Sequence, residues 1–154
     1  MKPILIQQLK GLIDGIDNPV TNLANTAALI MQMTPKVSWA GTYLTTNESK
    51  LILGPYQGKI ACNTIPFGKG VCGKAAQDQR TELVPNVNQF PGHIACDQAS
   101  QSEIVTPIIR DQKLIGVIDL DSNQLSAFNA NDEKILNQIA QILANGCNFD
   151  KIKI

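Results

Sequence analysis

The sequence is poor in aromatic residues and has neither an excess of charge nor a long apolar run. Lys and Arg together number 13, as do Asp and Glu, so the formal net charge is zero. Without a basic excess, neither nucleic acid nor an anionic membrane is indicated as a partner. No stretch approaches the roughly 20 apolar residues of a membrane span, and the N-terminal MKPILIQQLKGLIDG lacks a signal-peptide cleavage site. We therefore expect a cytoplasmic protein.

Size and composition predict one ordinary globular unit. Hydrophobic residues make up 44% of the 154 residues and charged residues 17%, which is typical of a folded domain. A chain of this length can build its own apolar core, so neither disulfides nor a structural metal is needed to hold it together. The sequence shows no internal repeat or linker. Residues 1–154 are therefore expected to form a single domain.

Hydrophobic periodicity predicts helices at both ends of the chain and strands between them. An amphipathic helix is expected within residues 1–16, and a second helix over 18–33. Strands are expected at residues 37–45, 51–56, 63–66, 82–87, 103–109 and 114–121, and further helices at 71–79 and 129–145. This order favours an α+β fold with a central antiparallel sheet flanked by helices, the N-terminal and C-terminal helices packing on one side.

Residues 88–102, NQFPGHIACDQASQS, form a long polar segment without clear periodicity. A loop of this length in a compact domain is often functional, so this segment is predicted to be the active-site loop. It contains Cys96 and, three positions earlier, His93, the only histidine of the sequence. Cys96 is therefore a candidate for a nucleophile that a substrate can reach. The alternative is a cysteine buried in the loop for packing.

The other three cysteines carry different signals. Cys72 begins a predicted helix, and a helix N-terminus lowers the pKa of a thiol below its usual value of about 8.5; packing between two glycines is the alternative. Cys62 gains a role only as a partner, because the sulfenic acid left by a first thiol condenses with a second one. Cys147, near the end of the last helix, is expected to be a packing or surface residue.

A zinc site is an alternative use of the same residues. His93 and Cys96 have a ligand-like spacing, and Cys62 and Cys72 could complete a Cys3His set. However, the sequence contains no CxxC pair. We therefore expect no bound metal and no bound cofactor.

Three carboxylates stand out in the two strongest predicted strands. Asp119 and Asp121 alternate and so share one face of their strand; they form either a solvated strand end or a binding point for an ammonium group. Glu103 opens the preceding strand and lies near this pair if the two strands form a hairpin. Burial and like charge raise the pKa of a carboxyl, which makes Glu103 a candidate proton donor to a leaving oxygen.

Trp39 and Tyr43 are four positions apart on a predicted strand, so they too can share a face. One interpretation is that both residues belong to the apolar core. The other is that they form an aromatic wall for an apolar methyl group of a ligand.

Several motifs in order carry a resemblance to a known family. They are LGPYQGKIAC ending at Cys62, GKGVCG around Cys72, GHIACDQAS around Cys96, SEIV around Glu103, and GVIDLDS around Asp119. Together they closely resemble the free methionine-(R)-sulfoxide reductases, which are stand-alone GAF domains. The likeness covers about residues 18–143. It implies a GAF fold, usually a homodimer, and free L-methionine (R)-sulfoxide as substrate.

The resemblance also implies residue roles. Cys96 matches the attacking cysteine, Cys62 the resolving cysteine, and Cys72 a third cysteine that can join the exchange. The matching residues of the substrate pocket are the acidic cluster of Glu103, Asp119 and Asp121, the aromatic side formed by Trp39 and Tyr43, and Ile94 and Ala95 directly before Cys96.

The reaction so implied passes through a sulfenic acid and an intramolecular disulfide, which thioredoxin then reduces at the expense of NADPH. Three carboxylates near Cys96 should raise the pKa of its thiol, so activation is expected to come with the substrate. The alternative is a GAF module that binds a small ligand or senses redox state without turnover, because one fold hosts both uses.

Overall fold

A computed structural model describes residues 1–46, 48–94, 96 and 98–152. Its elements in chain order are α1 (Ile4–Ile13), α2 (Pro19–Met33), β1 (Trp39–Thr45), β2 (Lys50–Gln57), β3 (Thr64–Pro66), α3 (Gly70–Asp78), β4 (Glu82–Val84), β5 (Ser102–Arg110), β6 (Lys113–Ser122) and α4 (Ala130–Gly146), with short 3-10 helices at Val87–Gln89 and Phe149–Lys151. Each predicted helix and strand is present, with its ends shifted by a few residues at most.

Side-chain caps fix the starts of α2 and α4. The Asn18 side chain accepts a hydrogen bond from the Thr21 amide, and Pro19 occupies the first helical position of α2, where its missing N–H costs nothing. At α4, Asn129 and Asp132 form a reciprocal capping box. None of the helices in the described residues combines the length and apolar character that crossing a membrane requires.

The strands of the described residues form one six-stranded sheet in the order β3-β2-β1-β6-β5-β4, with every neighbouring pair antiparallel. β5 and β6 lie at the centre of this arrangement with β1 and form a hairpin. Its turn residues, Asp111 and Gln112, both have positive φ angles, of 49° and 62°, as the tight two-residue turns that match strand twist require. This hairpin brings Glu103 beside the end of β6, as predicted.

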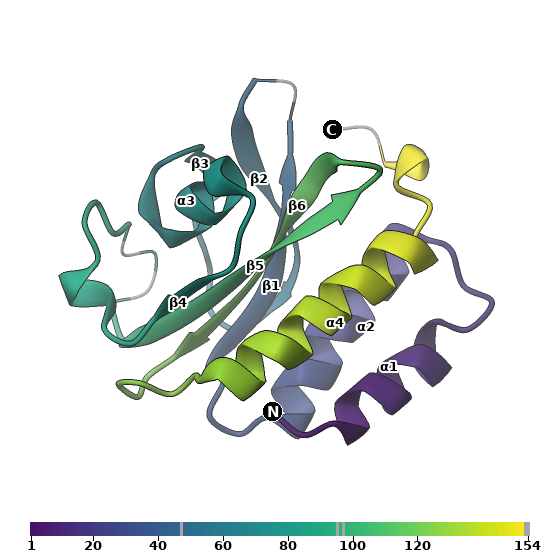
Figure 1. The fold of residues 1–154 in the computed structure, drawn as a ribbon, viewed down its shortest axis with the longest axis horizontal. Coiled ribbons are helices and arrows are strands. Elements are labelled where there is room, and N and C mark those ends of the chain that lie inside the picture. The colour runs from purple at the N-terminus through teal and green to yellow at the C-terminus, as the bar shows by residue number, and fades with distance from the viewer. Residues whose placement is uncertain (47, 95, 97, 153–154) are drawn as a thin grey trace.

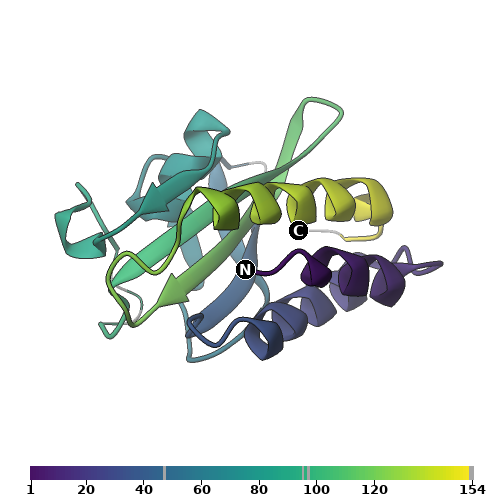
Figure 2. The same ribbon diagram turned by 60° about the horizontal axis from the view of Figure 1, so that its bottom comes forward.

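The sheet has helices on both of its faces (Figures 1 and 2). Helices α1, α2 and α4 cover one face, which confirms the predicted packing of the N-terminal and C-terminal helices on one side. The core under them includes Leu5, Leu23, Ile30, Ile104, Ile118, Leu120, Leu136 and Ile139. Helix α3 lies on the opposite face. The smaller core there includes Trp39, Tyr43, Leu51, Val71, Cys72, Val105 and Val117.

The helix expected within residues 1–16 is shorter than that range. It ends at Ile13, because the chain turns at Gly15, whose φ of 70° lies in the left-handed region that favours glycine. Ile16 therefore lies beyond the helix and is exposed. The buried face of α1 consists of Leu5, Leu9 and Ile13.

The segment 88–102, predicted to be a loop throughout, has ordered ends. A 3-10 helix, Val87–Gln89, is capped by Asn86, whose side chain accepts a hydrogen bond from the Asn88 amide. At the other end Ser102 already belongs to β5. The irregular part of the segment is thus confined between two anchored ends, which holds Cys96 near the α3 face of the sheet.

Candidate functional site

A row of functional side chains crosses three neighbouring strands on the α3 face. Trp39 of β1 pairs with Asp121 of β6, which in turn pairs with Glu103 of β5. One step along β6, Asp119 pairs with Gly41. Directly paired residues of antiparallel strands lie on the same face. The three carboxylates and the aromatic residue are therefore assembled by strand register alone, as the alternation in the sequence predicts.

An open cavity lies on this face, between the sheet, α3 and the segment after Gln89. The predicted site residues that line it are Trp39, Tyr43, Cys72, Ile94, Cys96, Glu103, Asp119 and Asp121. Ala95 lies outside the described residues. Cys62 is not part of the lining but is bonded to Cys96, at the exposed rim. The structure thus brings the predicted residues together around one space.

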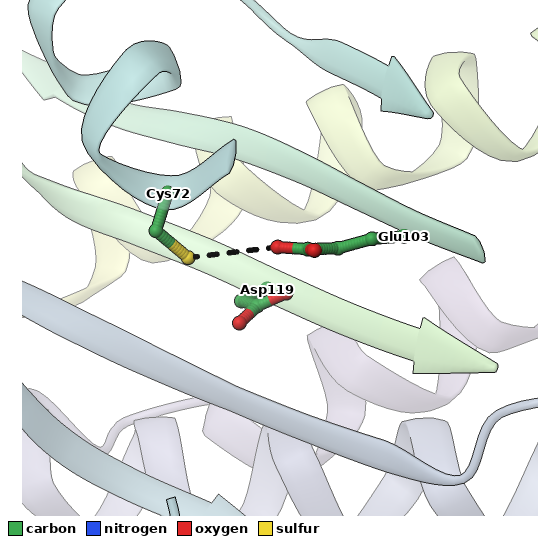
Figure 3. Close-up of side chains that lie close together, drawn as sticks. All are labelled: Cys72, Glu103 and Asp119. Carbon is green, nitrogen blue, oxygen red and sulfur yellow. Dashed lines mark hydrogen bonds between the residues drawn. The ribbon is translucent and has the colours of Figure 1, made fainter. Parts of the chain in front are cut away.

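Cys72, Glu103 and Asp119 form a compact buried group at the floor of the cavity (Figure 3). Their side chains project toward one another from α3, β5 and β6, and the residues are 3%, 6% and 6% exposed. The Cys72 thiol donates a long hydrogen bond to Glu103 Oε1, with a sulfur-to-oxygen distance of 4.0 Å. One ligand-type atom from each of the three lies within 4.8 Å of the others.

Burial dominates the electrostatics of this group. It raises the pKa of Glu103 well above its usual value, and the charges of Asp119 and Asp121 add to the effect. Burial likewise raises the pKa of Asp119, with the charge of Asp121 as the next cause. Both shifts favour the protonated form of these carboxyls, which is the form that can donate a proton.

The predicted lowering of the Cys72 pKa is wrong. Cys72 does lie in the first turn of α3, but burial raises its thiol pKa well above the usual value, and the charges of Asp119 and Glu103 raise it further. The carboxylates that the sequence places near Cys96 thus also act on Cys72. The electric field of a helix N-terminus stabilises a thiolate by about 0.3–1 kcal/mol. Here the loss of hydration of the thiolate and its repulsion by neighbouring carboxylates outweigh that stabilisation.

Cys62 and Cys96 are joined by a disulfide, with their Cα atoms 5.5 Å apart. Cys96 is exposed and Cys62 is half-buried. The bond uses two of the four residues of the alternative Cys3His zinc set. Cys72 and Cys147 are free and buried. Cys147 accepts a hydrogen bond from Asn22 Nδ2 at 3.6 Å within the helical core, so it is a packing residue, as predicted.

An aromatic stack forms one wall of the site. The ring centroid of Trp39 lies 6.2 Å from that of Tyr43 and 5.3 Å from that of Tyr56, and both pairs are stacked. The indole Nε1 donates to the Lys59 carbonyl at 3.0 Å, and the Tyr43 hydroxyl donates to the Cys62 carbonyl at 3.1 Å. The aromatic wall therefore also anchors the chain segment that carries Cys62.

Sequence reasoning did not identify three residues that shape the site. Tyr56 extends the aromatic stack from β2, and Ser100 Oγ donates a hydrogen bond to Asp121 Oδ1. At Gly41 a Cβ atom would lie 2.4 Å from the Trp39 ring and 2.4 Å from Tyr56 Cβ. The position of Gly41 between Trp39 and Tyr43 on one strand face could have indicated that a side chain there would collide with the aromatic rings. No feature of the nearby sequence indicates a role for Ser100.

His93, considered above as a zinc ligand, lines the cavity beside Ile94. Its Nδ1 is buried without a hydrogen-bond partner among the described residues. Burial lowers the pKa of the imidazole, because the charged form loses water. His93 is therefore a neutral wall of the cavity at pH 7.

Sequence comparisons with known proteins agree on a GAF-domain family. The model of the GAF domain matches residues 20–146. GAF domain-containing protein A of Dictyostelium discoideum is 49% identical over 92% of this chain and 89% of its own. The free methionine-R-sulfoxide reductase of Saccharomyces cerevisiae is 46% identical over 94% of this chain and 84% of its own.

Solved structures agree with the sequence comparison. The X-ray structure of free methionine-R-sulfoxide reductase from Neisseria meningitidis, in complex with its substrate, superimposes with a TM-score of 0.89 at 40% identity. The match covers 92% of this chain and 85% of that one. The GAF fold, expected from the motifs, is thereby confirmed.

Proposed function

The chain belongs to the free methionine-R-sulfoxide reductase family of GAF domains, and we propose that it reduces free L-methionine (R)-sulfoxide to methionine. One observation carries this proposal. An exposed cysteine, Cys96, is bonded to Cys62 at the rim of a cavity that has acidic residues on its floor and an aromatic wall. Relatives from yeast, Escherichia coli and Neisseria bear the name of this activity.

The cavity offers complementary contacts for each end of the substrate. The carboxylates of Asp119 and Asp121 can accept the ammonium group, while the aromatic face of Trp39 can pack against the S-methyl group. A methionine sulfoxide within a peptide lacks that ammonium and would leave buried negative charge unpaired. Preference for the free amino acid follows from this penalty.

Glu103 is the proton donor in this proposal, since burial and the neighbouring carboxylates favour its protonated form. Protonation of the sulfoxide oxygen makes the substrate sulfur electrophilic. Attack by the Cys96 thiol and transfer of the oxygen then yield methionine and a Cys96 sulfenic acid; the proton from Glu103 stays on the sulfenic oxygen, and the thiol proton passes to Glu103. One sulfoxide is reduced and one thiol is oxidised, so the step balances.

The sulfenic acid is resolved by a second thiol. Condensation of the Cys62 thiol with the Cys96 sulfenic acid releases water and forms the disulfide of the structure. A dithiol reductant of the thioredoxin type, supplied by NADPH, then restores both thiols by exchange. Cys72 can enter this exchange only after a rearrangement, because it is buried and its pKa is raised. We place the activity in the cytoplasm, in a homodimer.

The test is a coupled assay with thioredoxin, thioredoxin reductase and NADPH. We expect NADPH consumption with free methionine (R)-sulfoxide, and little with the S epimer or with N-acetylmethionine sulfoxide, which lacks the ammonium. Cys96→Ser should abolish turnover and Cys62→Ser should halt it after one equivalent of methionine. Cys147→Ser, which alters a packing thiol, is the matched control. Tight binding of the sulfoxide without any turnover would favour a ligand-sensing module instead.

A further inference from the structure

The floor of the cavity carries two buried acidic residues, Glu103 and Asp119. Glu103 and Asp119 make no salt bridge with any of the described residues. Both are about as deeply buried as core residues, and Cys72 is buried with them. Buried charge without a counter-ion is costly, so such a group either keeps protons or binds a cation.

One atom of this group is left without a partner. Asp119 Oδ1 is buried and has no hydrogen-bond partner among the described residues, although Asp119 is only 6% exposed and lines the cavity. Buried polar atoms are nearly always paired, so this oxygen is free to accept a contact from a ligand in the cavity. An ammonium group would satisfy this oxygen, but it would make no use of the neighbouring sulfur of Cys72.

The sulfur and its two carboxylate neighbours match the donor preferences of zinc. Zinc binds thiolate sulfur at about 2.3 Å and carboxylate oxygen at about 2.0–2.2 Å in tetrahedral geometry, which sets sulfur and oxygen about 3.5 Å apart. The Cys72 Sγ and Glu103 Oε1 atoms are 4.0 Å apart, and the set with Asp119 spans no more than 4.8 Å. Cys72 Sγ and Glu103 Oε1 would have to approach by about 0.5 Å, and the most widely spaced pair by at most about 1.3 Å, to form three protein ligands.

We propose that Cys72, Glu103 and Asp119 form a zinc-binding site, with water as the fourth ligand, at the floor of the cavity. This set differs from the Cys3His set considered from the sequence and does not involve the Cys62–Cys96 disulfide. Binding replaces the Cys72 S–H bond with a zinc–sulfur bond and releases that proton, together with any proton held by the two carboxyls. No group is oxidised or reduced.

The site makes zinc an inhibitor rather than a cofactor. Zinc would occupy the oxygens of Glu103 and Asp119 that, under the proposed function, donate a proton and bind the ammonium group. Zinc and methionine sulfoxide should therefore exclude each other. This last step rests on the proposed reductase function, whereas zinc binding itself does not.

Cobalt(II) added to the oxidised Cys147→Ser protein tests the binding site directly. Cys62 and Cys96 are bonded in that protein and Cys147 is removed, so Cys72 is the one free thiol of the four cysteines. We expect one cobalt ion per chain and a near-ultraviolet sulfur-to-cobalt charge-transfer band, which zinc abolishes by displacement. Glu103→Gln and Asp119→Asn, made in this background and checked by circular dichroism, should each weaken binding at least tenfold.

Absence of the band in the folded Cys147→Ser protein would overturn the proposal. So would an unchanged affinity in both carboxyl variants. Inhibition is measured separately in the reduced wild-type enzyme, where zinc should raise the KM for methionine sulfoxide with little effect on kcat. A cobalt band in a protein without reductase activity would support the metal site and contradict the proposed function, so the two failures are distinguishable.

Discussion

The hydroxyl of Tyr43 donates a hydrogen bond to the backbone carbonyl of Cys62, with an oxygen-to-oxygen distance of 3.1 Å. This hydrogen bond joins β1 to the segment that follows β2. It therefore holds Cys62, one of the two disulfide cysteines, against the aromatic wall. Burial raises the pKa of Tyr43, with the charge of Asp119 as the next cause, so the hydroxyl keeps its proton and remains a donor.

Tyr43→Phe should therefore slow disulfide formation more than it slows the first chemical step. The ring and its stacking on Trp39 are kept, while one hydrogen bond worth about 1 kcal/mol is lost. In a single turnover, methionine release should be nearly unchanged and the Cys96 sulfenic acid should persist several times longer, as trapping with dimedone can show. Equal lifetimes in wild type and variant would remove Tyr43 from a positioning role.

Glu103→Gln should lower kcat by about 100-fold or more, the usual contribution of a positioned acid. The fold should be as stable as the wild type or more so, because a buried acidic group is removed. Steady-state kinetics and urea unfolding measure the two effects. Glu82→Gln is the control, since Glu82 lies on the neighbouring strand β4 and pairs with Arg80 away from the cavity. Full activity in Glu103→Gln would argue against proton donation by this residue.

Alkylation rates should separate the cysteines of the reduced protein. The thiolate is the reactive form, and burial with nearby carboxylates raises the pKa of Cys72. At pH 8, brief treatment with iodoacetamide should label exposed Cys96 at least ten times faster than Cys72, as mass spectrometry of the peptides would record. Cys147, also buried with a raised pKa, is the internal comparison. Preferential labelling of Cys72 would revive its assignment as an activated thiol.

Gly41→Ala should destabilise the protein by about 1–3 kcal/mol, the range for adding a methyl group to a packed core. The new Cβ would lie 2.4 Å from both the Trp39 ring and Tyr56 Cβ. Urea unfolding measures the change, and KM should rise because the aromatic wall is displaced. Gly11→Ala is the matched control, because a Cβ there meets nothing within 4 Å; the helical position should gain up to about 1 kcal/mol.

Asp132 should contribute stability that depends on pH. Burial alone would raise its pKa, but hydrogen bonds from Lys36 and from the N-terminal ammonium outweigh this and hold the pKa below the usual 3.8. The Lys36 Nζ lies 2.5 Å from Asp132 Oδ2. Since the folded-state pKa is the lower one, the contribution is present above about pH 4 and is lost as pH falls through the folded-state value.

Asp132→Asn should therefore lower the free energy of unfolding at pH 7 by about 3 kcal/mol, as expected when a buried pair loses one partner. Urea unfolding at a series of pH values should show the difference from wild type shrinking as the solution becomes acidic. Asp14→Asn, at an exposed position, should give no such trend. A difference that stays constant down to pH 3 would contradict the assignment.

The side-chain placements that the structure confirms follow from one local rule. Asp119 with Asp121, and Trp39 with Tyr43, are separated by even numbers of residues on one strand, so period-two alternation is enough to place each pair on one face. To place Glu103 beside these carboxylates, one must also predict the tight turn at Asp111 and Gln112, which sets the register of the hairpin. Both signals are contained in short stretches of sequence.

What could not be predicted depends on distant packing. Burial of Cys72 between α3 and the sheet, together with carboxylates from two strands, raises its pKa. The sequence near Cys72 indicates only that a helix begins there. Ser100 reaches Asp121 across 21 positions through the fold of an irregular segment. The pairing of Cys62 with Cys96 came from the family resemblance, because spacing alone leaves several pairs open.

The alternation along β6 has a consequence for genetic change. Asp119 and Asp121 face the cavity, while Ile118 and Leu120 between them face the helical core. Deleting or inserting one codon within this strand would turn carboxylates toward the apolar helices and, at the same time, isoleucine toward the cavity. Frame-preserving indels here should thus yield insoluble chains rather than folded, inactive ones, whereas point substitutions at the same acids can silence the enzyme and spare its architecture.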